Sequence, residues 1–284
     1  MTGSLRFLFP ALFLVVLTAA PVRAEAPKTV ASIAPVHSLL AGVMEGVGSP
    51  MLLLKGGASP HSYALKPSDA RALAKAQAVF WIGPGLEGFL VKPLAGLSAK
   101  TRIIELAKDY KDADPHIWLD PRIAGGIAGT MAKIMADIDP ANAVRYRRNA
   151  EKLQARLKLL EIEVWKILAP VAVVPYLVFH DAYRYFEKRF DLASQGAVAI
   201  DSDRPPGARR ISALRRKIAA NNIACVFTEP GSKPALAGTL TEGTDARIGV
   251  LDPLGSGLAP GPKLYDTLMT EMARSMVACL GANG

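Results

Sequence analysis

Residues 140–168 read PANAVRYRRNAEKLQARLKLLEIEVWKIL, and their spacing predicts one long helix. The apolar residues recur three or four positions apart, and the opposite face is charged. The apolar stripe consists of Leu153, Leu157, Leu160, Val164 and Leu168. At a rise of 1.5 Å per residue, 29 residues span roughly 43 Å, which exceeds the diameter of a small domain. We therefore expect this helix to link two lobes, with Pro170 ending it.

Short apolar strands alternate with amphipathic helices on both sides of this helix. We expect strands at 29–33, 51–54, 78–82, 171–179, 223–228 and 247–251, and further helices at 68–77, from 121, at 209–221 and at 263–280. Such alternation predicts parallel sheets with helices on both faces. The expected fold is α/β, with two Rossmann-like lobes at 25–139 and 170–284, one rigid helix at 140–169 between them, and a cleft.

The first 24 residues predict a secretory signal peptide. Arg6 precedes an uncharged apolar run over 7–20, and Val22-Arg23-Ala24 fits a small-residue cleavage site. The run is shorter than the roughly 20 residues that a membrane-spanning helix needs. No cysteine follows it, so a lipid anchor is not indicated. We expect export to the periplasm.

Charge and cysteine content narrow the function further. The formal charge is +9, and it falls to +7 when Arg6 and Arg23 leave with the signal peptide. Basic residues do not interleave with aromatic ones, so we expect no nucleic-acid partner. The two cysteines, Cys225 and Cys279, favour one disulfide in an oxidising compartment, with two buried thiols as the alternative.

Four side chains at strand ends and loops are candidate metal ligands. His61 follows an expected strand, within the loop 56–67, and His116 stands just before an expected helix. His180 and Asp252 each directly follow an expected strand. Ligands of open α/β sheets bind at the carboxyl ends of strands, so at least three of these side chains point toward one region if the lobes face each other.

Three histidines favour zinc over the other divalent metals. Imidazole suits Zn²⁺, Cu²⁺ and Ni²⁺, whereas Mn²⁺ prefers carboxylate oxygen. Zinc usually takes four ligands in a tetrahedron, so Asp252 or a water would complete the set. Each histidine also has a structural interpretation: His61 as an exposed loop residue, His116 packed on a nearby tryptophan, and His180 bonded to the aspartate after it. For His37, in the first turn of a helix, the structural interpretation is favoured.

Several segments resemble one family of metal receptors. The chain is similar to the zinc-specific solute-binding proteins of ABC importers, the ZnuA type, within cluster A-I, which also binds manganese and iron. The matching segments are 32–39, 57–63, 65–68, 114–121, 179–186, 206–208, 227–230 and 251–255. They cover essentially the whole mature chain in order.

The resemblance implies high-affinity zinc capture and delivery to a membrane permease. It implies two α/β lobes joined by a rigid helix, with zinc in the cleft held by His61, His116 and His180. Asp252 matches a position where manganese- and iron-binding relatives supply a carboxylate. The Cys225–Cys279 bridge matches one found in some zinc-binding members. We expect a monomer without enzymatic activity.

Two departures from the family pattern concern metal binding. Many zinc-binding members carry a long loop rich in histidine before the second ligand. The corresponding segment here, residues 108–113, is short and contains no histidine. This departure argues against a second collecting site. Some members have a glutamate immediately before the first histidine ligand, and that position is Pro60 here.

Two other functions fit three histidines. A metallohydrolase also uses three protein ligands and a water, with Glu229 or Asp181 as a general base. Against it, the chain has no His-Glu-x-x-His motif. The same receptor fold could also serve manganese or iron.

Overall fold

The computed structural model describes residues 25–110, 114–199, 206–232 and 234–281. The expected signal peptide, residues 1–24, lies outside these residues. Within the described part of the chain, no helix is long and apolar enough to cross a membrane.

The first sheet has four parallel strands in the order β2-β1-β3-β4. The strands are β1 (Thr29–Ala31), β2 (Met51–Leu52), β3 (Ala78–Trp81) and β4 (Arg102–Glu105). The helices α1 (Ala34–Val43), α2 (Pro67–Lys75) and α3 (Val91–Ala95) connect them. Every residue of β1 and β3 is buried, as expected for the central strands of a covered parallel sheet. Strand β4 was not predicted, because this edge strand is short and begins with two exposed residues.

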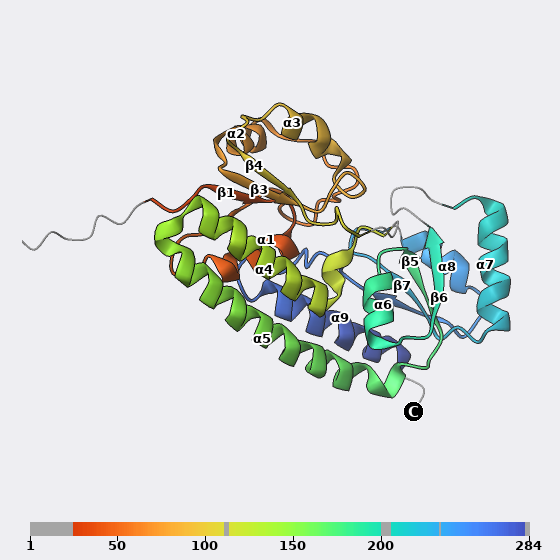
Figure 1. Ribbon diagram of the computed structural model, residues 1–284. Coiled ribbons are helices and arrows are strands. Elements are labelled where there is room, and N and C mark those ends of the chain that lie inside the picture. Colours follow the sequence, from red (N-terminus) through yellow and green to blue (C-terminus); the bar gives the residue numbers. More distant parts are fainter. Residues whose placement is uncertain (1–24, 111–113, 200–205, 233, 282–284) are drawn as a thin grey trace, which may run out of the picture.

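The second sheet repeats this strand order as β6-β5-β7-β8. Its strands are β5 (Tyr176–His180), β6 (Ser194–Ala199), β7 (Cys225–Thr228) and β8 (Arg247–Val250). Its helices are α6 (Arg184–Phe190), α7 (Ala208–Ala220) and α8 (Pro234–Thr241). The strand expected over 171–179 begins only at Tyr176, because a 3-10 helix at Ala169–Val171 and a turn precede it. The two sheets confirm the predicted α/β class with two parallel-sheet lobes (Figure 1).

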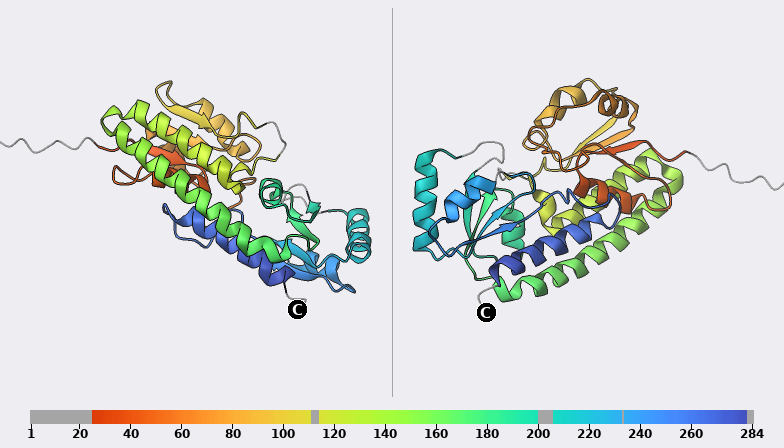
Figure 2. Two further views of the ribbon diagram at one scale, coloured as in Figure 1. Left: turned by 60° about the horizontal axis from the view of Figure 1, so that its bottom comes forward. Right: turned by 180° about the vertical axis from the view of Figure 1, so that it is seen from behind.

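The long helix is present as α5 (Ala143–Leu168), after a 3-10 turn at Pro140–Asn142. Its predicted apolar stripe is buried in full. Two further helices pack along it, α4 (Pro121–Ile138) and α9 (Leu264–Leu280). Figure 2 shows α9 running beside α5, so the long helix that joins the lobes is supported by other helices packed along it.

Hydrogen bonds from Tyr265 tie α9 to the first half of the chain. The backbone N–H of Tyr265 donates to Oγ of Ser38 over 3.0 Å, and its hydroxyl donates to the carbonyl of Trp118 over 2.6 Å. The indole N–H of Trp118 donates in turn to the carbonyl of Pro253 over 2.8 Å. All these groups are buried, so they fix the C-terminal segment against the first lobe.

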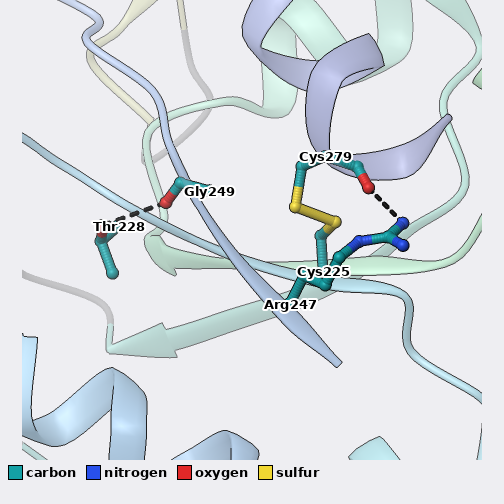
Figure 3. The surroundings of a disulfide bond; sticks show 5 residues. All are labelled: Cys225, Thr228, Arg247, Gly249 and Cys279. Carbon is teal, nitrogen blue, oxygen red and sulfur yellow. Dashed lines mark hydrogen bonds between the residues drawn. A yellow bond between two sulfur atoms is a disulfide. The ribbon is translucent and has the colours of Figure 1, made fainter. Parts of the chain in front are cut away.

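The predicted disulfide joins Cys225, at the start of β7, to Cys279, near the end of α9 (Figure 3). The two Cα atoms lie 6.2 Å apart. The guanidinium of Arg247, on β8, donates to the carbonyl of Cys279. The bridge therefore fixes the end of α9 to the second sheet.

Glu87 is a fully buried acid at the carboxyl end of the first sheet. Its Oε2 accepts the backbone N–H groups of Ile82 and Gly83, which directly follow β3, over 2.9 and 3.0 Å. Burial disfavours the ionised form and raises the pKa of Glu87 to about 7, despite these donors. Glu87 therefore holds the β3 end of the sheet best as a neutral acid.

We expect Glu87→Gln to remove a pH dependence of stability. The pKa of Glu87 is about 7 in the folded protein and 4.5 in the unfolded chain. The unfolded chain therefore loses its proton first, and the free energy of unfolding falls as pH rises from 4.5 to about 7. Glutamine keeps an acceptor oxygen and cannot ionise. In urea denaturation, the free energy of unfolding of the variant should rise relative to that of the wild type above about pH 5, by about 3 kcal/mol at most. Glu45→Gln, at an exposed position, is the matched control. If the free energy of unfolding depended on pH equally in the wild type and in Glu87→Gln, the raised pKa of Glu87 would be contradicted.

Candidate metal centre

His61 lies in the loop between β2 and α2. The loop turns at Gly56 and Gly57, whose φ angles of +69° and +74° favour glycine. A Cβ at Gly57 would lie 3.0 Å from the side chain of Ser256, in the other half of the chain. The backbone N–H of His61 donates to Oγ of Ser59 over 3.3 Å. This tight loop therefore brings His61 against the second lobe.

His116 is buried, and Asp114 holds its ring. Oδ1 of Asp114 accepts the backbone N–H of His116 over 2.9 Å and lies 2.7 Å from Nδ1 of the ring. Directly after His116, a 3-10 helix at Ile117–Leu119 leads into α4, which Asp120 caps through the N–H of Arg122. Burial lowers the pKa of His116, although Asp114 opposes the shift. The ring is therefore neutral at pH 7, the form that binds metal.

His180 is the last residue of β5, and Glu229 orients it. Nδ1 of His180 lies 3.1 Å from Oε1 of Glu229, which directly follows the neighbouring strand β7. The hydroxyl of Tyr183 donates to the same Oε1 over 3.0 Å. Strand order reverses between these two strands, which is where open α/β sheets bind ligands.

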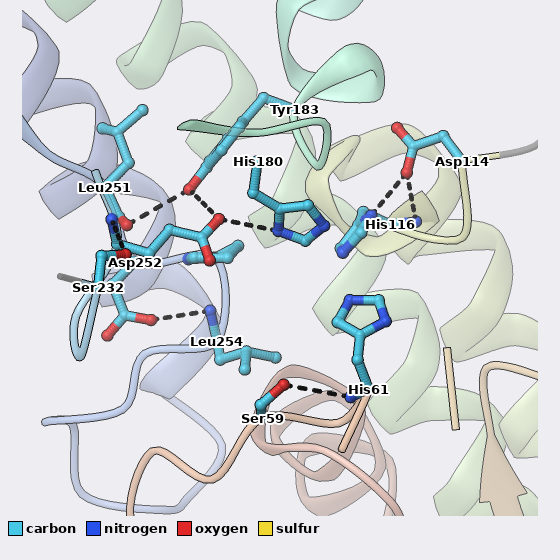
Figure 4. Close-up of polar contacts among 12 residues, drawn as sticks. Ser59, His61, Asp114, His116, His180, Tyr183, Ser232, Leu251, Asp252 and Leu254 are labelled. Atoms are coloured by element: carbon cyan, nitrogen blue, oxygen red, sulfur yellow. Dashed lines mark hydrogen bonds and ion pairs between the residues drawn. The ribbon is translucent and has the colours of Figure 1, made fainter. Parts of the chain in front are cut away.

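The three histidine rings meet in one cluster. One ligand nitrogen from each of His61, His116 and His180 lies within 4.8 Å of the other two. The ring centroids are 5.8, 5.2 and 5.0 Å apart. In His116 and His180 a carboxylate engages Nδ1, and Figure 4 shows Nε2 of each pointing into the space between the rings. A histidine that bonds a carboxylate through one nitrogen and offers the other is the usual arrangement of a zinc ligand.

Both lobes line the cavity around this cluster. Its other walls are Gly57, Ser59, Pro60, Glu229, Pro230, Gly231, Ser232, Asp252, Pro253, Leu254 and Ser256. The cluster therefore lies between the lobes, and the helical layer and Tyr265 fix their separation.

Asp252 lies in the cavity but outside the histidine cluster. Its carboxylate accepts the backbone N–H groups of Leu254, Gly255 and Ser256 over 3.0, 2.9 and 2.6 Å. Oδ1 takes the first two and Oδ2 the third. In this structure Asp252 therefore holds the loop after β8, and its role as a fourth ligand stays a prediction.

His37 has a structural position in α1. It is buried, and its Nε2 lies 3.1 Å from the carbonyl oxygen of Pro50. Burial lowers its pKa, so the neutral ring donates this hydrogen bond. His37 is not part of the cluster that the described residues form.

The sequence did not reveal the roles of Asp114 and Glu229 as hydrogen-bond partners of the histidine rings. Asp114 precedes His116 by two residues, a spacing that allows one carboxylate to bond both backbone and ring. Glu229 directly follows the expected strand 223–228, as His180 and Asp252 follow theirs, and that signal could have placed it at the cavity.

Two parallel-sheet lobes with a histidine cluster between them define a metal-binding receptor. Residues 29–279 match the family model for ZnuA, the periplasmic component A of a zinc-uptake complex. The chain belongs to the ZnuA family.

Curated relatives and solved structures agree with this family. The high-affinity zinc uptake system protein ZnuA of Brucella abortus is 36% identical, with 90% of this chain and 92% of the relative covered. The protein of the same name from Yersinia pestis is 32% identical, with 93% and 94% covered. A crystal structure of ZnuA matches with a TM-score of 0.80 at 25% identity, covering 90% of this chain and all of that one. A crystal structure of a ZnuA deletion mutant with zinc bound matches with a TM-score of 0.78 at 27% identity, covering 92% of this chain and all of that one.

We expect Glu229→Ala to weaken zinc binding about 10- to 100-fold, because His180 loses the carboxylate that fixes its ring and tautomer. Glu229→Gln should bind with intermediate affinity, since its oxygen still accepts from Nδ1. Competition with a chromophoric chelator measures both constants.

Glu271→Gln, an exposed position on α9, is the control for charge loss, and circular dichroism checks the fold of each variant. Wild-type affinity in Glu229→Ala would contradict the positioning role.

Proposed function

We propose that this chain captures one Zn²⁺ ion between its lobes in the periplasm and delivers it to the membrane permease of an ABC-type zinc importer. The cluster of His61, His116 and His180 carries this proposal. Membership of the ZnuA family supports the zinc-binding transport role. In this account residues 25–139 and 170–284 are the two lobes, and 140–169 is the helix that joins them.

The ligand chemistry supports zinc as the cargo. Three neutral imidazoles suit Zn²⁺, and Mn²⁺ would prefer more oxygen ligands. Nitrogens bound to tetrahedral zinc at about 2.0–2.1 Å lie about 3.3 Å apart. The ligand nitrogens here lie within 4.8 Å of one another. Zinc binding therefore requires each pair to approach by about 1.5 Å at most, which is within reach of local loop movement.

The fourth coordination position belongs to Asp252 or to a water. Oδ2 of Asp252 accepts one backbone N–H, from Ser256. A carboxylate oxygen has two lone pairs, so Oδ2 keeps one for a metal. Because the carboxylate also holds its own loop, binding through Oδ2 would move that loop toward His61.

Helix packing favours small closure over a large hinge motion. The lobes share the layer of α4, α5 and α9, and the buried bonds of Tyr265 join α9 to Ser38 and Trp118. Opening the lobes as rigid bodies would break these contacts. We infer that zinc enters and leaves by movement of the loops at His61 and Asp252.

The carboxylates around the site favour a receptor over a hydrolase. Glu229, the better-placed general base, accepts from Tyr183 and bonds His180. Asp181 forms an ion pair with Arg184. Both are engaged in holding the protein, so neither is poised to activate a water. We propose a monomer without hydrolytic activity and without a nucleic-acid partner.

Isothermal titration of the metal-stripped mature protein with Zn²⁺ and then Mn²⁺ tests this function. We expect one tight zinc site and much weaker manganese binding. His180→Ala should weaken zinc by at least about 100-fold, because one of three imidazoles is lost. His37→Ala, outside the cluster, is the matched control, with its fold checked by circular dichroism. A preference for manganese, or no effect of His180→Ala, would refute the zinc site.

A further inference from the structure

The outer face of α5 exposes large apolar side chains. Leu159, Ile162 and Trp165 are 69%, 53% and 48% exposed. They follow one another at intervals of three residues, so they lie along one side of the helix, away from the buried stripe. Val144 and Val173, 77% and 85% exposed, add apolar surface near its two ends. Contiguous apolar side chains on an exposed helix face indicate an interaction surface.

Basic side chains flank this apolar row. The exposed basic residues of α5 are Arg145, Arg147, Arg148, Lys152, Lys158 and Lys166. The exposed acidic residues are two, Glu151 and Glu163. Among the described residues, Lys158 and Lys166 form no ion pair. The face is therefore cationic as well as apolar, and its partner should be anionic and able to accept apolar side chains.

The geometry points to an anionic phospholipid surface as that partner. The face is one ridge about 39 Å long at 1.5 Å per residue, and it follows the margin of the molecule (Figure 1). A tryptophan and aliphatic side chains between lysines suit the boundary between headgroups and acyl chains. A second copy of the chain would set this cationic face against itself, and like charges would repel.

Adsorption through this face leaves the zinc cavity accessible. No described residue of α5 lines the cavity. The helix backbone is already bonded within α5 and packed on α4 and α9, so only the outer side chains would enter the lipid. Binding would therefore be weak and reversible, which suits a carrier that must leave the membrane to collect zinc. This use of the surface rests on the proposed transport function, but the lipid contact itself does not.

Trp165 reports on the contact directly. The chain has three tryptophans, and the other two, Trp81 and Trp118, are 6% and 0% exposed. Vesicles of phosphatidylethanolamine mixed with phosphatidylglycerol should shift the fluorescence of the mature protein to shorter wavelength. Vesicles of phosphatidylcholine alone should not, and added salt should reverse the shift. Co-sedimentation measures the partition constant.

Two variants test the apolar and cationic parts separately. Leu159→Ser/Ile162→Ser/Trp165→Ser should lower the partition constant at least about tenfold. Lys158→Gln/Lys166→Gln should lower it about tenfold. The matched controls lie on the first lobe: Val91→Ser/Ile103→Ser for exposed apolar residues and Lys75→Gln/Lys100→Gln for exposed lysines. Trp165→Phe should lose the fluorescence shift and keep co-sedimentation.

Three outcomes would overturn the proposal. They are the absence of vesicle binding, equal losses in the controls, and a concentration-dependent dimer that the apolar variant abolishes, which would assign the face to a second copy. Zinc titration of each variant separates this test from the zinc-binding proposal, because both variants should bind zinc as the wild type does.

Discussion

The account depends on three imidazole nitrogens held within 4.8 Å of one another by segments far apart in the chain. Side chains on loops cannot keep such positions alone, since each has rotamer freedom to lose. Asp114 and Glu229 restrict two of the rings through Nδ1, so Nε2 points into the cavity before metal arrives. If the three histidines bind metal as proposed, folding has already ordered two of the three rings, so metal binding loses less side-chain entropy.

The fold brings these rings together through two sheets of the same strand order. In the second sheet, His180 ends one central strand and Glu229 directly follows the other, at the point where strand order reverses. In the first sheet, the carboxyl group of Glu87 lies at the corresponding end of the central strand β3, where it accepts two backbone N–H groups. His61 and His116 come from loops of that lobe instead. The helical layer and the buried hydrogen bonds of Tyr265 fix the separation of the lobes, and so the separation of the rings, while the Cys225–Cys279 disulfide holds α9 to the second sheet.

Much of this architecture was predictable from sequence because it follows from periodic patterns. The apolar stripe of 140–168 predicted α5, and apolar runs predicted six of the eight strands among the described residues. Strand β4 has only two apolar residues, between Arg102 and Glu105, and β6 has one large apolar residue, Val198, so neither forms an apolar run that predicts a strand. Contacts between distant segments, such as Glu229 with His180 or Tyr265 with Ser38, leave no periodic trace. The sequence therefore identified the histidines but not the carboxylates that orient them.

X-ray absorption at the zinc K edge of the loaded protein tests the central claim most directly. The account predicts three imidazole nitrogens at about 2.0–2.1 Å, one oxygen at a similar distance, and no sulfur. His180→Ala should lower the number of imidazoles by one. A first shell with sulfur, or with oxygen in the majority, would contradict a site built on His61, His116 and His180.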